Sequence, residues 1–190
     1  MDAYAICGYM WVAWMLIWMA WALQSKQTQH RESFASQMSY ALVLWLAIYF
    51  IFFAKNLGYW WHSDVFAYRP WIGCTGVAIA VLGFAITFWA RFTLGGNWSS
   101  SVTVKVKHEL IRSGPYRWVR HPIYSGMILA MAGTAIARDQ WRGVVALVLM
   151  WVAFTIKRLK EEQFMRQTFG AQYTEYSDST GAIFPLLLRR

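Results

Sequence analysis

The chain has 190 residues and a formal charge of +9, and 58% of its residues are hydrophobic, 18% aromatic and only 14% charged. An apolar share this large excludes an ordinary soluble domain and a disordered chain, and it indicates a single integral membrane domain. The cations lie next to apolar runs, where anionic lipid headgroups attract each of them by about 1 kcal/mol. We therefore expect membrane lipids as partners, and no nucleic acid.

Three apolar runs in residues 1–92 are long enough to cross a bilayer. Ala3 to Leu23 carries no charge over 21 residues, and a helix of this length spans about 30 Å of hydrocarbon. We interpret it as a retained anchor and not as a cleaved signal peptide, because no basic segment precedes it. The second run, Met38 to Ala54, needs a few of the preceding residues to reach full length. The third, Trp71 to Phe92, follows Pro70, a residue favoured in a first helical turn.

Two shorter apolar runs follow in residues 93–190, the part expected to bind a cofactor and carry catalysis. Ile123 to Ala137 and Gly143 to Ile156 each have about fifteen residues, which is short for a full span, and only Arg138 to Arg142 separates them. We expect a tight helical hairpin. The predicted fold class is an all-α integral membrane protein with about five transmembrane helices, a cytoplasmic loop and a C-terminal helix extension. A four-crossing arrangement with a re-entrant hairpin stays open.

The distribution of cations predicts how the chain is oriented. With five crossings, fourteen Lys and Arg residues fall on one side of the membrane and four on the other. Cytoplasmic loops carry an excess of Lys and Arg. The N-terminus is therefore predicted to lie outside and the C-terminus in the cytoplasm, in the plasma (inner) membrane.

Cysteine, histidine and tryptophan residues predict no metal centre and no redox site. Cys7 and Cys74 fall inside apolar runs without CxxC spacing, which favours packing roles. The histidines, which lack the spacing of metal ligands, are His30, His62, His108 and His121. The tryptophans expected at interfacial belts and on lipid-facing surfaces, without a cofactor role, include Trp11, Trp14 and Trp18.

The first segment that could carry chemistry runs from Thr93 to Pro122. The alternation of valines with polar residues around Thr103 predicts a short extended segment. Gly114 and Pro115 then form a turn, and the sequence YRWVRHPIY follows with Pro122 as a natural first helical residue. It brings together Tyr116, Arg120, His121 and Tyr124. By composition alone, a basic and aromatic interfacial anchor explains this cluster about as well as a functional site does.

The second such segment is KRLKEEQFMRQTFGAQYTEY, which continues the last apolar helix from Lys157 until Gly170 can end it. Lys157 and Glu161 are four residues apart and share a helical face, a spacing that usually gives a surface ion pair of little value. Glu161 and Glu162, however, directly follow a membrane helix, where an unpaired carboxylate is costly. A ligand with positive charge would compensate them.

Together, the motifs GPYxxxRHPxYxG and EExxxxxxFGxxYxxY resemble the isoprenylcysteine carboxyl methyltransferase family, integral membrane enzymes that use S-adenosylmethionine and form S-adenosylhomocysteine. The resemblance covers roughly Gly95 to Pro185, about half of the chain. Related phospholipid methyltransferases share parts of the pattern. The resemblance implies methyl transfer to a lipophilic small-molecule or lipidated acceptor at the cytoplasmic membrane face, with a carboxylate of isoprenylcysteine type as the first expectation.

The resemblance also implies site residues. Residues at the family's cofactor-binding positions are Thr103, His108, Leu110, Ile111, Tyr116, His121, Pro122, Tyr124 and Glu161. The residues expected to be catalytic are Lys157, Arg120 and Glu162. The family has an arginine that is implicated in orienting the substrate carboxylate at the position of Lys157, and lysine lacks that planar two-pronged fork. Arg120 or Arg158 could take its place.

Several alternatives stay open. The chain could methylate the amine of a phospholipid, act as a membrane reductase, against which the paired glutamates argue, or bind lipid without catalysis. A carboxylate acceptor needs no general base, whereas an amine or thiol would need Glu162, His121 or Tyr124 to take its proton. The sequence also leaves the acceptor and the oligomeric state undetermined, because the spacing from Gly126 to Gly133 suits internal packing and dimer contacts equally.

Overall fold

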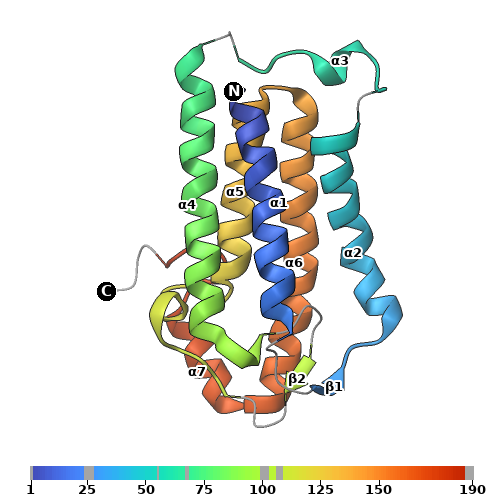
Figure 1. Cartoon of the computed structure of the whole chain (residues 1–190). Coiled ribbons are helices and arrows are strands. Elements are labelled where there is room, and N and C mark those ends of the chain that lie inside the picture. Colours follow the sequence, from blue (N-terminus) through green and yellow to red (C-terminus); the bar gives the residue numbers. More distant parts are fainter. Residues whose placement is uncertain are drawn as a thin grey trace.

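The computed structural model describes residues 2–23, 28–54, 56–66, 69–98, 103–105 and 109–186. Within these ranges the chain forms an elongated bundle of long helices that run side by side, with a short helix and a small two-stranded sheet at one end (Figure 1). The predicted helical membrane fold is therefore confirmed in outline. The sheet is an addition that the sequence indicated only as a short extended segment.

The long helices begin and end close to the predicted apolar runs. They are α1 (Ala3–Ala22), α2 (Phe34–Ile48) with a π-helical turn (Tyr49–Phe53), α4 (Pro70–Leu94), α5 (Pro122–Arg138) and α6 (Trp141–Phe169). The shorter helical elements are α3 (Tyr59–His62), α7 (Ala171–Ser179) and the 3₁₀ turns Gly95–Asn97 and Gly114–Arg117. Strand β1 (Thr28–Arg31) pairs antiparallel with β2 (Thr103–Lys105) and so joins the loops that follow α1 and α4.

Three helices are long and apolar enough to span a membrane: Ala3–Ala22, Phe34–Phe53 and Trp71–Asn97. Helix α5 has only 17 residues, and α6 has 29 but becomes strongly charged in its second half. Both lie inside the bundle, where neighbouring helices cover many of their side chains. The prediction of five spans therefore remains a prediction.

Local sequence chemistry explains most helix boundaries. The side chains of Asp2 and Ser33 accept hydrogen bonds from the first turns of α1 and α2. Pro70 and Pro122 begin α4 and α5, as predicted. Gly170 ends α6, also as predicted, with a φ of 52° that favours glycine.

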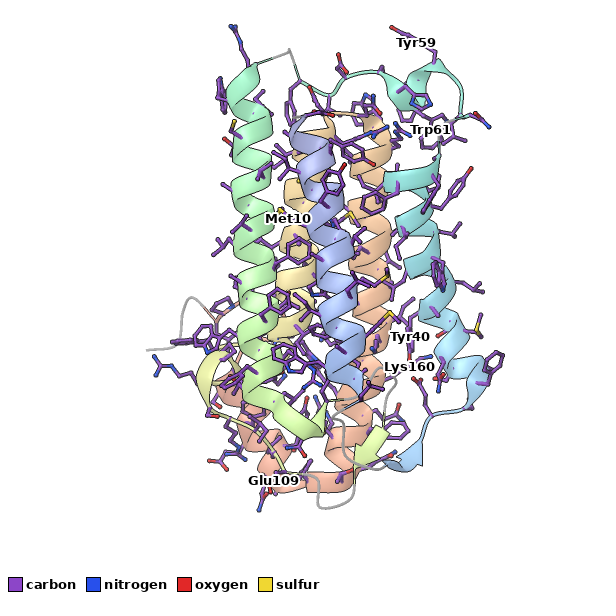
Figure 2. All side chains as sticks on the ribbon, viewed as in Figure 1. Met10, Tyr40, Tyr59, Trp61, Glu109 and Lys160 are labelled. Atoms are coloured by element: carbon purple, nitrogen blue, oxygen red, sulfur yellow. The ribbon has the colours of Figure 1, made fainter. Side chains whose placement is uncertain are left out.

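The predicted helical hairpin of α5 and α6 is confirmed, and it turns at the end of the bundle away from α7. Only Asp139 and Gln140 separate the two helices. Figure 2 places Tyr59 and Trp61 at this end as well, and Glu109 and Lys160 toward the α7 end. Arg142 fixes the turn, because its buried guanidinium donates to the carbonyl of Ala54 at 2.7 Å.

Helices α4 and α5 pack backbone against backbone through glycines. A Cβ atom added to Gly76 would lie 2.6 Å from the carbonyl oxygen of Gly133, and one added to Gly83 would lie 2.6 Å from that of Gly126. Both distances are too short for any side chain, so only glycine permits this approach. The spacing from Gly126 to Gly133 thus serves packing within the chain.

The core contains some residues that the sequence assigned elsewhere. Cys7 is fully buried, which confirms its packing role, but Cys74 is exposed, so the same prediction is wrong for that residue. Trp11 was expected to face lipid or the interface. Instead its indole donates to the hydroxyl of Thr134 at 2.9 Å and packs edge-on against Phe84. The reason is that α1 turns this face toward α4 and α5.

The segment after α7 folds back onto the start of α5. The amides of Arg120 and His121 donate to the carbonyls of Gly181 and Ala182 at 2.8 and 3.0 Å. The hydroxyl of Ser125 donates to the carbonyl of Ile183 at 2.6 Å. These bonds bring α7 and the chain after it against the two predicted functional segments.

We predict that Gly83→Val destabilises the protein by about 3 kcal/mol, because the new side chain would force α4 away from α5. Thermal unfolding in detergent, followed by tryptophan fluorescence, measures the effect. Gly8→Ala is the matched control, since an added Cβ there meets nothing within 4 Å. Equal stability of Gly83→Val and the wild type would show that the two helices are not packed this closely.

Candidate active site

A cavity of about 900 Å³ runs along the inside of the bundle. Its apolar part lies between α1, α2 with its π-helical turn, α5 and α6, and its polar part lies at the α7 end. Residues from Ala5 to Trp18 of α1 line it, so it follows this helix for about 20 Å at 1.5 Å per residue. The chain thus encloses one continuous space with an apolar part and a polar end.

Glu161 is the acidic centre of the polar end. Its carboxylate accepts a hydrogen bond from the hydroxyl of Tyr124 at 2.5 Å and lies 3.4 Å from Nδ1 of His121. The ring of His121 stacks on that of Tyr124, with centroids 5.3 Å apart. The side chain of Glu161 remains 24% exposed and lines the cavity. One face of this carboxylate is therefore held by the protein and the other is open to a ligand.

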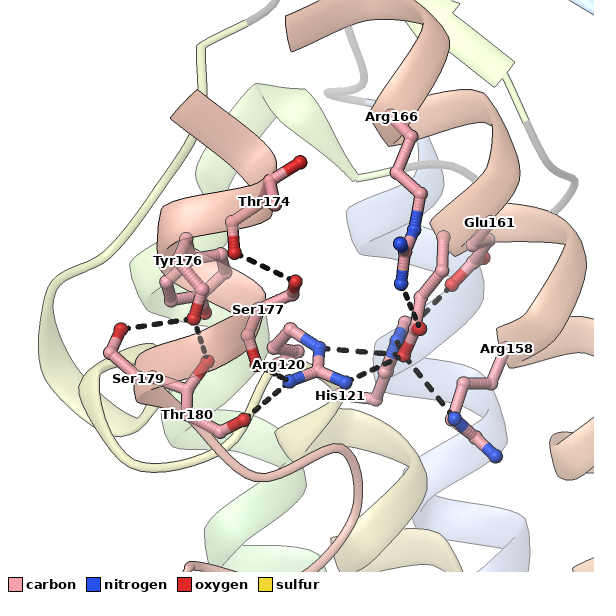
Figure 3. Close-up of polar contacts among 11 residues, drawn as sticks. Arg120, His121, Arg158, Glu161, Arg166, Thr174, Tyr176, Ser177, Ser179 and Thr180 are labelled. Carbon is pink, nitrogen blue, oxygen red and sulfur yellow. Dashed lines mark hydrogen bonds and ion pairs between the residues drawn. The ribbon is translucent and has the colours of Figure 1, made fainter. Parts of the chain in front are cut away.

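His121 lies between two carboxylates, since its Nε2 is also 3.2 Å from Glu162 (Figure 3). Burial alone would lower the pKa of His121, but hydrogen bonds to both glutamates and their charges outweigh burial and raise it. Burial would raise the pKa of Glu161, yet the hydrogen bond from His121 and the charge of Lys157 lower it. We therefore describe His121 as an imidazolium between two ionised glutamates.

Glu162 is surrounded by cations and does not line the cavity. Its Oε1 lies 3.2 Å from Arg120 and 3.3 Å from Arg158, and Oε2 lies 3.9 Å from Arg166. Burial would raise the pKa of Glu162, but the hydrogen bond and charge of His121 and the two nearer arginines lower it to about 2. The Glu162 carboxylate thus links α6 to the residues that precede α5.

Arg120 connects the two functional segments, because it also donates to the carbonyls of Ser177, at 2.7 Å, and Thr180. It lines the cavity as well. Arg158, named above as a possible substitute for an arginine at position 157, does not line the cavity and instead contacts Glu162.

Lys157 lies one helical turn before Glu161, where the wall of the cavity changes from apolar to polar. Its side chain is 8% exposed and lines the cavity beside Phe154. Its Nζ is 5.4 Å from the ring centroids of both Tyr40 and Tyr124. Within the described part of the chain, Lys157 and Arg120 are the two Lys or Arg residues that line this cavity.

The structure brings most of the predicted cofactor residues together. Those that line the cavity are Leu110, Ile111, Tyr116, His121, Tyr124 and Glu161. Pro122 is buried as the first residue of α5. The side chain of Thr103 and all of His108 lie outside the described part of the structure, so their roles stay predictions.

Sequence reasoning missed other residues of the cavity. Tyr173 and Tyr176 line it from α7, and the hydroxyl of Tyr176 donates to the carbonyl of Tyr116 at 2.6 Å. The YxxY part of the second motif was a signal for them. Trp14 and Trp18 line it from α1, where uniformly apolar sequence offered no sign of which face is turned inward.

Comparison with known proteins agrees with this architecture. The model of the isoprenylcysteine carboxyl methyltransferase (ICMT) family matches residues 76–167. A solved structure of a eukaryotic intramembrane Ras methyltransferase, ICMT, superposes with a TM-score of 0.58 at 24% identity and covers 82% of this chain and 54% of that chain. The structural likeness concerns the fold.

Curated relatives have similar sequences. A probable protein-S-isoprenylcysteine O-methyltransferase of Oryza sativa subsp. japonica is 30% identical over 140 residues, which is 72% of this chain and 68% of the relative. Protein-S-isoprenylcysteine O-methyltransferase A of Arabidopsis thaliana is 30% identical over 62% of this chain and 61% of its own. For the Homo sapiens enzyme the identity is also 30%, over 62% of this chain and 42% of its own. The chain thus matches between 42% and 68% of the length of these relatives.

The matched family region contains the whole first motif and the paired glutamates that open the second, and the polar end of the cavity is built around these residues. The identity to the rice relative also extends over more than two thirds of that protein. We conclude that the chain belongs to the isoprenylcysteine carboxyl methyltransferase family, a class of membrane methyltransferases.

Proposed function

We propose that this protein transfers a methyl group from S-adenosylmethionine to the carboxylate of a lipophilic acceptor of the isoprenylcysteine type. The observation that carries the proposal is one cavity that follows α1 for about 20 Å and joins an apolar part to a polar end at Glu161. A water-soluble acceptor would not need the apolar part. The family membership and the names of the relatives support the same reaction.

The polar end has the chemistry that S-adenosylmethionine requires. Glu161 is ionised and open to the cavity, which suits the cationic amino group of the methionine moiety. Leu110, Ile111 and Tyr116 supply apolar and aromatic surface for an adenosine group. When bound, S-adenosylmethionine supplies a methyl group that is already activated by its sulfonium. The protein then has to align the acceptor and exclude water.

The residues around the cavity favour a carboxylate acceptor over an amine. An amine has to lose a proton before it can accept a methyl group. Both ring nitrogens of His121 already face carboxylates, and Glu162 has a pKa of about 2 and does not line the cavity. Neither residue is suited to act as a general base. An acceptor carboxylate needs no base, and Lys157 can neutralise its charge at the boundary between the apolar and polar parts.

Access from the membrane is supported by lining residues that are also exposed. Tyr9 and Val12 of α1 and Phe53 of the π-helical turn line the cavity and are 66%, 52% and 66% exposed. The cavity therefore reaches the bundle surface between α1 and α2, on apolar helices that suit a lipid environment. We propose that the acceptor tail enters there. We further propose that the α7 end lies in the cytoplasm of cells whose plasma (inner) membrane holds this protein.

We predict that Glu161→Gln weakens S-adenosylmethionine binding at least tenfold, because a charged hydrogen bond contributes roughly 1.5–3 kcal/mol. Calorimetry on protein in detergent measures the affinity. Glu175→Gln is the control, since that side chain is 79% exposed on α7. Unchanged affinity of Glu161→Gln would overturn the assignment of this residue. If the wild type binds no S-adenosylmethionine, the proposed function is wrong.

We predict that Gly8→Leu blocks the lipophilic acceptor without affecting the cofactor. Ala5, Gly8, Val12 and Met15 follow helical spacing along the cavity, and an added Cβ at Gly8 meets nothing within 4 Å. The new side chain therefore fills the apolar part. We expect kcat/KM for a farnesylated acceptor to fall at least tenfold, since misplacement by about 1 Å can cost a hundredfold.

Transfer of labelled methyl groups measures kcat/KM in this comparison, and calorimetry measures S-adenosylmethionine affinity. Gly58→Leu is the matched control, because an added Cβ at Gly58 also meets open space and Gly58 does not line the cavity. Full activity of Gly8→Leu would place the acceptor tail elsewhere.

A further inference from the structure

The chemistry proposed above leaves one buried carboxylate unexplained. Glu32, which directly follows β1, is only 6% exposed. Its Oε2 accepts a hydrogen bond from the hydroxyl of Ser36 at 2.6 Å, and its Oε1 accepts one from the hydroxyl of Tyr40. Neither Glu32 nor Tyr40 lines the cavity. Burying a charged carboxylate costs free energy unless the charge is paired. The partners of Glu32 therefore indicate its role.

Both of those partners, Tyr40 and Ser36, contact lysines of α6. The Nζ atoms of Lys157 and Lys160 lie 5.4 and 5.6 Å from the centroid of the Tyr40 ring. Lys160 also donates to the carbonyl and hydroxyl oxygens of Ser36, each at 2.8 Å, and to the hydroxyl of Ser39 at 2.6 Å. Figure 2 shows Tyr40 and Lys160 where α2 faces α6. The start of α2 is thus fixed to α6 directly behind Lys157.

Two tyrosine rings contact the ammonium group of Lys157. Its Nζ lies 5.4 Å from the ring centroid of Tyr124 as well as from that of Tyr40. The hydroxyl of each ring donates to a glutamate, Tyr124 to Glu161 and Tyr40 to Glu32. Donation to a carboxylate polarises a phenol and makes its ring more attractive to a cation. We call Lys157, these two tyrosines and these two glutamates the lysine clamp.

The lysine clamp addresses a weakness of lysine as a binding group. A lysine side chain is flexible and loses up to about 2 kcal/mol of rotamer freedom when it is fixed. If the protein already fixes Lys157, an anionic ligand no longer has to supply that free energy. Glu161 belongs to the polar end, whereas Glu32 and Tyr40 lie behind Lys157 and have no contact with the space a ligand would use.

We propose that Glu32 and Tyr40 are positioning residues that fix Lys157 for the anionic head group of the acceptor. The proposal rests on the proposed function and extends it, because it specifies an acceptor with a carboxylate next to its lipid tail. Glu32 and Tyr40 lie outside both sequence motifs, so the proposal also assigns a role in substrate selection to the chain around the start of α2.

A double-mutant cycle tests the lysine clamp. The probes are N-acetyl-S-farnesylcysteine and its methyl ester, which has the same tail without the charge. Their Kd values are measured by calorimetry with saturating S-adenosylhomocysteine, for wild type, Tyr40→Phe, Lys157→Met and the double variant. We expect Tyr40→Phe to weaken binding of the carboxylate about fivefold, or about 1 kcal/mol, because the ring loses its hydrogen bond to Glu32 and attracts and positions Lys157 less strongly.

The same substitution should leave binding of the ester unchanged, and it should have no further effect once Lys157→Met is present. Glu32→Gln should behave like Tyr40→Phe. The controls are Tyr59→Phe, at a side chain 90% exposed on α3, and Glu175→Gln on α7. Affinity for S-adenosylhomocysteine within about twofold of the wild type shows that Tyr40→Phe and Glu32→Gln leave the polar end intact. Thermal unfolding in detergent checks that Lys157→Met and the double variant are folded.

Three results would overturn the lysine clamp. Tyr40→Phe could lower the affinity for the carboxylate equally in the wild type and in Lys157→Met, or lower the affinity for the ester as much as that for the carboxylate. The third is a wild type that does not bind the carboxylate. Transfer of labelled methyl groups by the wild type tests the proposed function separately. Clamp-dependent binding without transfer would overturn the function and leave the clamp standing. Methyl transfer by the wild type, together with additive effects of the two substitutions, would support the function and overturn the clamp.

Discussion

The interaction on which the rest of the site depends is that of His121 with Glu161 and Glu162. It joins the start of α5 to the second half of α6, two segments that are distant in sequence. Loss of either carboxylate would leave one ring N–H of a buried imidazolium without its hydrogen-bond partner, which is costly. Arg120 and Arg158 then balance Glu162, and Tyr124 and Lys157 balance Glu161. The positions of α7 and of the cavity wall follow from this arrangement.

Two neighbouring acids therefore have different roles because a helix turns about 100° per residue. Glu161 faces the cavity and keeps a carboxylate edge open, whereas Glu162 faces Arg166 and Arg120, of which Arg120 also holds α7. The motif alone treats them as a pair. Their environments separate them into a carboxylate for ligand binding and a carboxylate that holds the fold together.

Local chemistry explains what could be predicted from the sequence. Pro70, Pro122 and Gly170 fix helix boundaries through backbone restrictions that act within a few residues. The two motifs also brought together Tyr116, His121 and Glu161, since a family pattern preserves the geometry of its fold. The contacts of Trp11 with Thr134 and of Tyr40 with Lys157 join helices far apart in the chain. They depend on helix rotation, which a uniformly apolar sequence does not encode visibly.

The glycine contact between α4 and α5 has a mechanical consequence. Backbones that touch at Gly76, Gly83, Gly126 and Gly133 leave no space for sliding or compression, so α4 supports α5 as a stiff wall of the cavity. Helix α1 and the π-helical turn after α2 also line the cavity, and some of their lining side chains reach the outer surface. Widening of the cavity therefore meets less backbone packing at α1 and α2 than at α5. The cavity thus has a rigid side at α5, which holds His121 and Tyr124 in place, and a more compliant side at α1 and α2, which can adapt to acceptor tails of different shape.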